Sequence, residues 1–231
     1  MTQHRFRALI MDMDGVLVDS EPVHGRAWEC VLTALGAPCE PGWFLSWIGV
    51  PDDALADRLV ASGAVPLAKS ELLRRKRETY NARVLEEMRA FPGVKDALRE
   101  LNGTPCAVAT SSGRDSARLA LGLAGLLPYF AAMVCWEDVA RHKPAPDPYV
   151  RAAQLLGVPP RDCAAVEDSP AGIASAKAAG CVALAVKTSY PHERLVAADY
   201  VFETPRDALD WLRPRLAVAT GPTETPRPEN A

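Results

Sequence analysis

The chain has 231 residues, of which 48% are hydrophobic and 24% are charged, and its formal net charge is −3 at pH 7. Such a composition is typical of a soluble globular protein with a sizeable core, and the weak negative charge argues against nucleic acid or an anionic membrane as a partner. Because no apolar stretch is long enough for a bilayer span and residues 1–7 leave no room for a signal peptide, we expect a cytoplasmic protein.

The first predicted element is a short buried strand over residues 8–11, Ala-Leu-Ile-Met, which is apolar on both faces. Such strands belong to parallel sheets, whose ligands bind outside the carboxyl ends of the strands. Asp12 and Asp14 follow this strand directly. Two neighbouring carboxylates repel each other unless a cation lies between them, and Mg²⁺ suits oxygen ligands and phosphates. The alternative is a plain Asp-x-Asp-Gly turn that closes a surface strand.

The region from residue 21 to about residue 89 has helical spacing and no convincing strand. Apolar residues recur at this spacing around Trp28 and again from Leu72 to Met88. The breaker cluster Phe91-Pro92-Gly93 then marks the return to a different pattern. We therefore predict an all-helical cap domain over residues 19–89, inserted into an α/β core.

Short apolar runs alternate with helical patterns in the rest of the chain. The predicted strands are residues 106–109, 132–135, 163–166 and 182–186, and the predicted helices are residues 114–123, 147–156 and 171–179. This alternation indicates a Rossmann-like parallel sheet with helices on both faces. The core would take residues 1–18 and 90–218. The tail 219–231 is rich in Pro, Thr and Glu, which predicts disorder.

The six cysteines are scattered along the chain and form no Cys-x-x-Cys pair. Cys106, Cys163 and Cys181 lie in or beside apolar runs, which suits buried free thiols. This distribution argues against a disulfide framework and a zinc site, and it favours a reducing compartment.

Three further polar segments follow predicted strands, as the first pair of acids does. Thr110-Ser111 precedes a predicted helix, where hydroxyl and backbone N–H groups suit a phosphate oxygen; the alternative is a plain helix cap. Lys143 precedes a proline, which predicts a stiff, extended loop whose ammonium group suits phosphoryl charge; the alternative is a solvated basic loop. Glu167-Asp168 ends the next strand and suggests a second set of metal ligands.

Together these segments resemble the haloacid dehalogenase superfamily of phosphohydrolases, and most of all the branch of β-phosphoglucomutase and the phosphoglycolate or sugar-phosphate phosphatases. The resemblance extends from the first strand to beyond Gly180. The segments that carry it are Asp12-Met13-Asp14-Gly15-Val16-Leu17-Val18-Asp19-Ser20, Val108-Ala109-Thr110-Ser111, Lys143-Pro144-Ala145-Pro146-Asp147 and Val166-Glu167-Asp168-Ser169-Pro170-Ala171-Gly172.

The resemblance implies a catalytic role for each of five residues. Asp12 would attack the phosphorus and form an aspartyl-phosphate. Asp14 would protonate the leaving oxygen and later accept a proton from the attacking water. Thr110 and the Ser111 N–H would hold phosphoryl oxygens, and Lys143 would offset the negative charge shared by the nucleophile and the phosphate.

The same resemblance implies Mg²⁺ as the cofactor. The Asp12 carboxylate, the Asp14 main-chain carbonyl and Asp168 would be its ligands. Glu167 would be either a further ligand or a residue that supports the ligands from behind.

Residues of the predicted cap would choose the substrate. His24 matches a histidine that assists phosphate transfer in the mutase branch; the alternative is a histidine that only packs at the interface between the domains. Lys76 matches a lysine that reaches the substrate in that branch; the alternative is a charged residue on a solvated helix face. Where this chain has Asp52, the mutase has an arginine that binds the distal phosphate of its substrate. The carboxylate of Asp52 would repel that phosphate, and this difference argues against mutase activity. Trp43 and Trp47 are either core residues or a platform at the mouth of the site.

We therefore predict a Mg²⁺-dependent phosphatase, expected as a monomer, that hydrolyses a small phosphomonoester such as a sugar phosphate or phosphoglycolate. A sugar phosphomutase of the β-phosphoglucomutase type is the alternative enzyme. A catalytically silent binding or regulatory module is the alternative from another class. The complete set of acids argues against that module, because clustered buried acids are costly without a metal.

Overall fold

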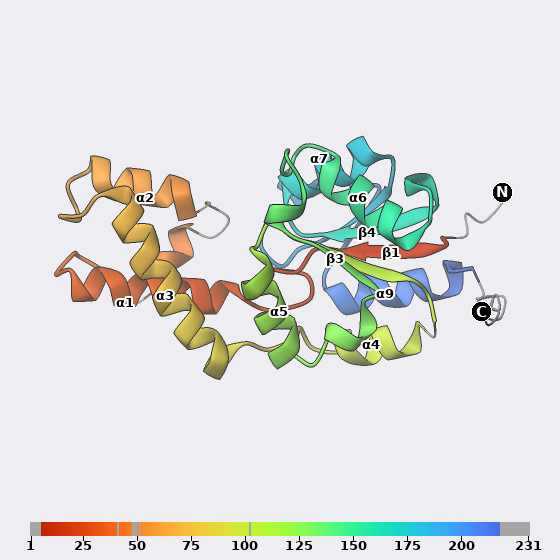
Figure 1. The fold of residues 1–231 in the computed structure, drawn as a ribbon, viewed down its shortest axis with the longest axis horizontal. Helices are drawn as coiled ribbons and strands as arrows, with labels where there is room; N and C mark the ends of the chain where they lie inside the picture. Colours follow the sequence, from red (N-terminus) through yellow and green to blue (C-terminus); the bar gives the residue numbers. More distant parts are fainter. Residues whose placement is uncertain (1–5, 41, 48–49, 51, 102, 218–231) are drawn as a thin grey trace, which may run out of the picture.

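The computed structural model describes residues 6–40, 42–47, 50, 52–101 and 103–217, without the side chains of residues 84–87. Two parts stand out in Figure 1: a group of helices from the first half of the chain, and a sheet covered by helices. The predicted disordered tail, 219–231, lies outside the described residues.

The described residues form a six-stranded, fully parallel sheet with the strand order β3-β2-β1-β4-β5-β6. The strands are β1 (Ala8–Met11), β2 (Cys106–Ala109), β3 (Ala132–Val134), β4 (Cys163–Glu167), β5 (Val182–Val186) and β6 (Tyr200–Phe202). The five predicted strands are confirmed to within one residue. The three-residue edge strand β6 was not predicted, because so short a segment carries little hydrophobic pattern.

Helices cover both faces of this sheet, which confirms the predicted fold class. One face carries α4 (Val94–Glu100), α5 (Arg114–Leu123) and α9 (Pro205–Leu212); the other carries α6 (Asp147–Leu156), α7 (Pro170–Ala179) and α8 (His192–Leu195). Figure 1 shows α6 and α7 on one side of the sheet and α4 and α9 on the other. Short 3₁₀ helices span Trp43–Trp47, Leu127–Tyr129, Trp136–Asp138, Pro160–Asp162 and Arg213–Arg215.

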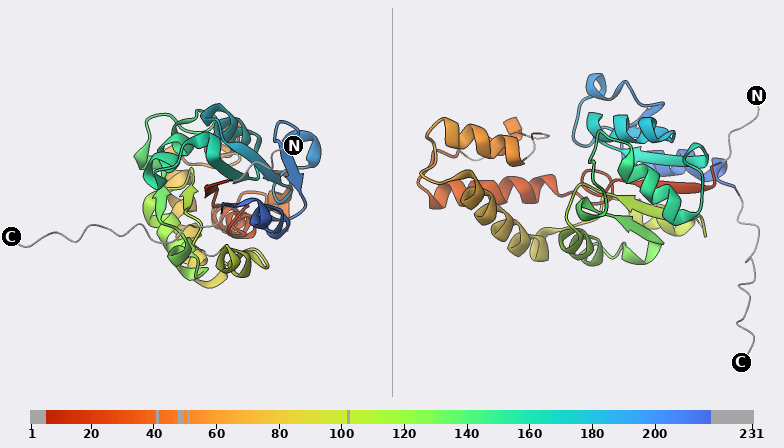
Figure 2. Two further views of the ribbon diagram at one scale, coloured as in Figure 1. Left: turned by 90° about the vertical axis from the view of Figure 1, so that its right-hand side faces the viewer. Right: turned by 45° about the horizontal axis from the view of Figure 1, so that its top comes forward.

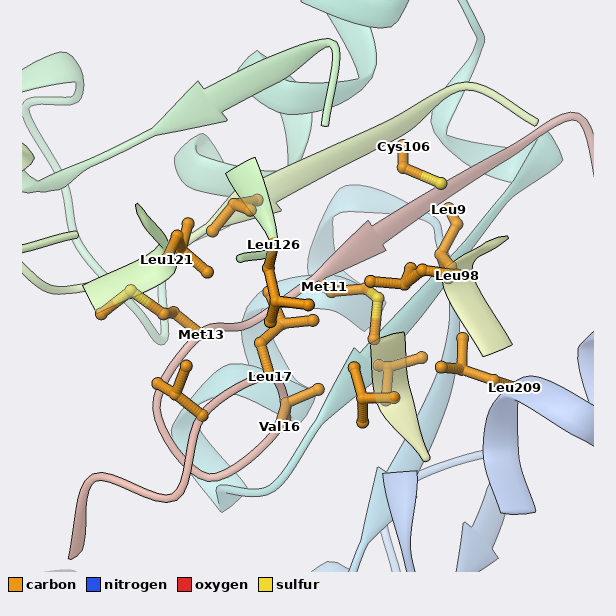
Figure 3. Packing of buried hydrophobic residues seen from close by; sticks show 14 of the residues in the cluster. Leu9, Met11, Met13, Val16, Leu17, Leu98, Cys106, Leu121, Leu126 and Leu209 are labelled. Atoms are coloured by element: carbon orange, nitrogen blue, oxygen red, sulfur yellow. The ribbon is translucent and has the colours of Figure 1, made fainter. Parts of the chain in front are cut away.

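Alternation along β1 divides its side chains between two buried clusters. Leu9 and Met11 join the cluster that includes Leu98 of α4 and Leu209 of α9, as Figure 3 shows. Ala8 and Ile10 join the cluster on the opposite face. That face of the sheet is rich in alanine, and small side chains allow α6 and α7 to approach the strands closely.

The loop after β1 is anchored in the same core. Met13, Val16 and Leu17 are at most 1% exposed and belong to this cluster, and Figure 3 shows Met13 near Leu121 and Leu17 near Leu126. Full burial of one such side chain contributes about 1.5–3 kcal/mol. The loop that carries the two leading acids is therefore held in place by its own apolar residues.

The helices between β1 and α4 form the helical insertion, which we define as Glu21–Glu87. Its helices are α1 (Glu21–Ala34), α2 (Asp52–Ala61) and α3 (Lys69–Glu87), and it has its own buried cluster around Trp28. Figure 2 shows these helices beside the sheet rather than on its faces. The two segments that join the insertion to the core pair with each other through an antiparallel bridge between Val18 and Ala90.

The structure also bears on two features of the sequence, the length of its apolar helices and the state of its cysteines. None of the helices among the described residues has both the length and the apolarity needed to cross a membrane. All six cysteines are free, and Cys106, Cys163 and Cys181 are buried as predicted.

Candidate active site

The site begins in the tight loop that follows β1. The Asp12 N–H donates to the Val166 carbonyl at 3.0 Å, which extends the pairing of β1 with β4 by one residue. Gly15 has φ of +76°, a conformation that favours glycine, and its N–H donates to the Val18 carbonyl at 3.0 Å. This turn brings Asp12 and Asp14 to the wall of one cavity.

The cavity has a volume of about 330 Å³ and lies between the carboxyl ends of the strands and the helical insertion. Its size suits a small metabolite rather than a macromolecule. From the core it is lined by Asp12, Asp14, Ser20, Thr110, Ser111, Ser112, Lys143, Asp168, Ser169, Ser189 and Tyr190, and from the insertion by Glu21, His24, Phe44, Val50 and Asp52.

Lys143 lies between two carboxylates at the base of the cavity. Its Nζ donates to Asp12 Oδ1 at 2.7 Å and to Glu167 Oε1 at 2.5 Å, and its side chain is 7% exposed. Burial alone would lower the pKa of Lys143, but the two carboxylates outweigh burial and raise it. The ammonium group therefore stays charged and fixed next to Asp12.

Glu167 is fully buried, and both of its oxygens accept hydrogen bonds. Oε1 accepts from the Tyr149 hydroxyl at 2.7 Å as well as from Lys143, and Oε2 accepts from the Ser169 hydroxyl at 3.1 Å. Because the oxygens are occupied in this way, the side chain is well suited to hold Lys143 in position. This tyrosine was not singled out from the sequence, since a buried tyrosine in a helix carries no distinguishing signal.

Gly172 in α7 makes room for the Glu167 carboxyl group. A Cβ at residue 172 would lie 1.9 Å from Glu167 Oε1. We expect Gly172→Ala to lower the free energy of unfolding by about 3 kcal/mol, because a buried charged group would have to shift. Urea unfolding measures this change. Gly122→Ala is the matched control in α5, where a Cβ would lie 3.4 Å from Leu127 Cδ1; we expect no loss there. Equal stability of both variants would contradict the crowding argument.

Three acids come together as one candidate cation site. Asp12, Glu167 and Asp168 each offer an oxygen within 4.8 Å of the others, and all three are buried. Burial raises the pKa of Asp12 to about 7 in spite of Lys143, and burial followed by the charges of Asp12 and Glu167 raises the pKa of Asp168. One ammonium group does not balance three carboxylates, so the donor set and its charge fit a hard divalent cation.

Asp168 is also held by residues around it. Ser189, which follows β5, donates its hydroxyl to Asp168 Oδ2, and a Cβ at Gly15 would lie 1.9 Å from that same oxygen. The sequence reasoning missed Ser189. Its place in the sequence could have indicated it, because Ser189 follows the carboxyl end of a predicted strand, as the other site residues do.

Asp14 also lines the cavity. Its Oδ2 accepts from the Ser112 hydroxyl at 2.8 Å, and its Oδ1 is buried without a partner among the described residues. Thr110 is 4% exposed and accepts through its hydroxyl oxygen from the Ser112 N–H at 3.0 Å. Thr110 and Ser111 both line the cavity, so hydroxyl and backbone groups face the same space as Asp12 and Asp14.

The insertion contributes a second polar cluster. Lys76 donates to Asp52 Oδ2 at 2.5 Å and contacts His24 Nδ1 at 2.5 Å, while the Trp28 indole donates to Asp52 Oδ1 at 2.8 Å. The Tyr80 ring lies 4.3 Å from the His24 ring, measured between centroids. His24 and Asp52 line the cavity, whereas the Lys76 side chain is 3% exposed and lies behind them.

Trp43 and Trp47 do not line the cavity. Their ring centroids are 5.5 Å apart, and both rings pack against the buried cluster of the insertion. Of the two interpretations left open by the sequence, this packing fits core residues better than a platform at the mouth of the site.

Burial and the nearby Lys76 lower the pKa of His24 from its usual 6.5 to about 4. Between these values the unfolded chain binds a proton that the folded chain does not, so stability falls as the pH drops from about 6.5 to about 4. We expect this residue to lower the free energy of unfolding by about 2 kcal/mol over that range, less than the full shift because its side chain is 27% exposed. Urea unfolding of wild type and His24→Asn at pH 7 and pH 4.5 isolates this contribution. Parallel pH dependence of the two proteins would contradict it.

This chain is similar to known proteins over most of its length. A family model described as "Haloacid dehalogenase-like hydrolase" matches residues 9–186, which confirms the predicted resemblance. Fructose-1-phosphate phosphatase YqaB of Escherichia coli is 35% identical over 184 residues, which cover 79% of this chain and 97% of that protein. Hexitol phosphatase A of the same organism is 36% identical over 203 residues, which cover 87% and 92%.

A solved structure of a candidate β-phosphoglucomutase from Thermotoga maritima has a similar fold. It superposes with a TM-score of 0.79 at 29% identity and covers 91% of this chain and all of that chain. The relatives therefore include both phosphatases and a protein linked by its description to mutase activity.

Proposed function

Because the chain belongs to the haloacid dehalogenase-like hydrolases, we propose that it is a Mg²⁺-dependent phosphatase that hydrolyses a small phosphomonoester through an aspartyl-phosphate intermediate. One observation carries this proposal: a buried lysine touches Asp12 beside an acidic cluster, at the base of a cavity also lined by Asp14. This arrangement combines a nucleophile, a fixed positive charge and an acid in one small space.

Asp12 is the proposed nucleophile. Its carboxylate forms a bond to phosphorus as the bond from phosphorus to the leaving oxygen breaks. Lys143 donates to Asp12 Oδ1, orients that carboxylate and offsets charge as the phosphoryl group approaches. Thr110 and the Ser111 N–H hold phosphoryl oxygens at the adjacent wall.

Asp14 is the proposed acid and base. It gives a proton to the leaving oxygen in the first step. In the second step it takes a proton from the water that attacks phosphorus while the bond between Asp12 and phosphorus breaks, so the protonation of Asp14 and the free carboxylate of Asp12 are both restored. The hydrogen bond from Ser112 to Oδ2 fixes the carboxyl group and leaves Oδ1 for the substrate.

Asp12, Asp168 and the Asp14 main-chain carbonyl are the proposed metal ligands, with Glu167 supporting them through Lys143. When bound, Mg²⁺ would neutralise phosphoryl charge and position the phosphate.

Residues 19–89 are the proposed cap domain, and residues 1–18 and 90–218 are the proposed catalytic core. The paired segments at Val18 and Ala90 connect them, and a small movement there would open or close the cavity. A cytoplasmic location and a monomeric state remain predictions for this enzyme.

The mutase alternative receives less support from the cavity. A mutase must bind a bisphosphorylated sugar. Where the mutase has an arginine for the second phosphate, this chain has Asp52, whose carboxylate lies at the cavity wall. Phosphate release to water is therefore the favoured outcome.

A phosphate-release screen tests the proposed function. Purified protein is incubated with a panel of small phosphomonoesters, with Mg²⁺ and with excess EDTA. We expect turnover of at least one substrate with Mg²⁺ and almost none with EDTA. Isomerisation of β-glucose 1-phosphate without phosphate release would favour the mutase, and no turnover of any substrate, including an aryl phosphate, would favour the silent module.

A further inference from the structure

We propose that the substrate is a monophosphate whose remaining part is uncharged and rich in hydroxyl groups, and that Asp52 enforces this choice by neutralising Lys76. This inference rests on the proposed phosphatase function and deepens it. It selects a sugar or polyol phosphate over phosphoglycolate and over bisphosphates.

The buried positive charge of Lys76 in the insertion is paired with a carboxylate. Lys76 is buried, and its ammonium group forms an ion pair with Asp52 at 2.5 Å. Both Asp52 oxygens are engaged, since the other accepts from Trp28. Asp52 lines the cavity and Lys76 does not, so the carboxylate of this pair faces the cavity, and the net charge of the pair is zero.

The described residues of the cavity wall offer little to hold a second anion. The Lys76 ammonium group contacts His24 Nδ1, and the depressed pKa of this histidine keeps its ring neutral at pH 7. Of the described residues at the cavity wall, Lys143 alone carries a permanent positive charge, and it is bound to Asp12 and Glu167. A distal phosphate or carboxylate would thus meet acids without a free cation.

Ser20 Oγ and Glu21 Oε2 are buried at the cavity wall and have no hydrogen-bond partner among the described residues. Burial and then the charges of Asp14 and Asp52 raise the pKa of Glu21 to about 7, so this carboxyl group can donate or accept. Substrate hydroxyl groups satisfy both atoms, because a hydroxyl also donates and accepts.

His24 adds a donor to this wall. Because the Lys76 ammonium group donates to Nδ1, the proton of the neutral ring resides on Nε2. Phe44 and Val50 supply apolar contact beside these groups. Donors, acceptors and a small apolar surface without free positive charge match the hydroxyl groups and carbon skeleton of a sugar or polyol.

The first test compares matched substrates in the wild-type enzyme with Mg²⁺. Fructose 1-phosphate is compared with fructose 1,6-bisphosphate, and glycerol 3-phosphate with 3-phosphoglycerate. We expect kcat/KM to be at least about tenfold higher for the neutral member of each pair. Glucosamine 6-phosphate, which carries a positive charge outside its phosphate, is compared in the same way with glucose 6-phosphate. Higher kcat/KM for the anionic or the cationic members would overturn the inference.

The second test changes the charge balance at the insertion. Asp52→Asn keeps an oxygen that can accept from Trp28 but leaves the charge of Lys76 uncompensated. We expect the ratio of kcat/KM between neutral and anionic members to fall at least about tenfold, mainly through a lower KM for the anionic substrates. Asp53→Asn is the matched control, because Asp53 is exposed and pairs with Lys69 outside the cavity. An unchanged ratio in Asp52→Asn would contradict the role of Asp52.

Lys76→Met covers the case in which Asp52→Asn does not fold. This variant leaves the Asp52 charge uncompensated, so we expect the ratio to rise instead of fall. An unchanged ratio in a folded Lys76→Met protein would likewise contradict the inference. The phosphatase function and the preference for uncharged substrates are refuted by different results. No hydrolysis of any phosphomonoester by wild type would refute the phosphatase function. Efficient hydrolysis with a preference for anionic substrates would refute only the preference.

Discussion

Asp12→Asn is expected to lower kcat for phosphomonoester hydrolysis by about 10⁴-fold or more while leaving the fold intact. The amide is a poor nucleophile, so no aspartyl-phosphate can form at this position. The fold should persist because Lys143 keeps its hydrogen bond to Glu167 at 2.5 Å when the Asp12 charge is removed. Phosphate release with Mg²⁺ and urea unfolding measure the two parts of this prediction.

Asp96→Asn is the matched control for this substitution. Asp96 lies in α4 with its side chain 65% exposed and pairs with Arg99 on the surface. The same change of carboxylate to amide there should leave kcat unchanged. Retention of Mg²⁺-dependent activity in Asp12→Asn would refute the assigned nucleophile.

Lys143→Met is expected to have the largest effect on stability, a loss of about 3–5 kcal/mol, together with the loss of turnover. Removal of one partner from a buried ion pair leaves the opposite charges uncompensated. Here the remaining charges would be the acidic cluster of Asp12, Glu167 and Asp168, whose oxygens lie within 4.8 Å of one another. Urea unfolding in EDTA measures the loss without compensation by a bound cation.

Lys177→Met separates this effect from the loss of an ordinary lysine. Lys177 also forms an ion pair, with Asp199 at 2.6 Å, but its side chain is 41% exposed. Surface pairs contribute about 0–1 kcal/mol, so this variant should remain close to wild type. Equal destabilisation by the two substitutions would contradict the buried charge balance at the site.

The sheet was predictable because its strands are buried on both faces. Residues 8–11 and 182–186 have no polar residue, so their apolar runs end where the strands end. The polar residues that follow are then gathered by topology, since the carboxyl ends of parallel strands lie at one edge. This is why Asp12, Lys143 and Glu167 were expected together, although more than 100 residues separate the first two.

The contacts around those residues could not be predicted, because they depend on side-chain directions. The occupation of both Glu167 oxygens by Lys143, Tyr149 and Ser169 is a result of packing between the end of β4, helix α6 and the loops that precede α6 and α7. The ion pair of Lys76 with Asp52 could not be predicted for the same reason. No local pattern links two residues that are 24 positions apart on different helices of the insertion.

The most direct test of the aspartyl-phosphate mechanism is a rapid-mixing measurement on Asp14→Asn with 4-nitrophenyl phosphate and Mg²⁺. This substrate has a good leaving group, so bond breakage needs little help from an acid, whereas hydrolysis of the intermediate still needs the base. We predict a burst of about one nitrophenol per enzyme, slow turnover afterwards, and a phosphoryl group on the peptide that contains Asp12 by mass spectrometry after acid quenching. Turnover without a burst, with no phosphoryl group on that peptide, would contradict the assignment of Asp12 and Asp14 to the two steps.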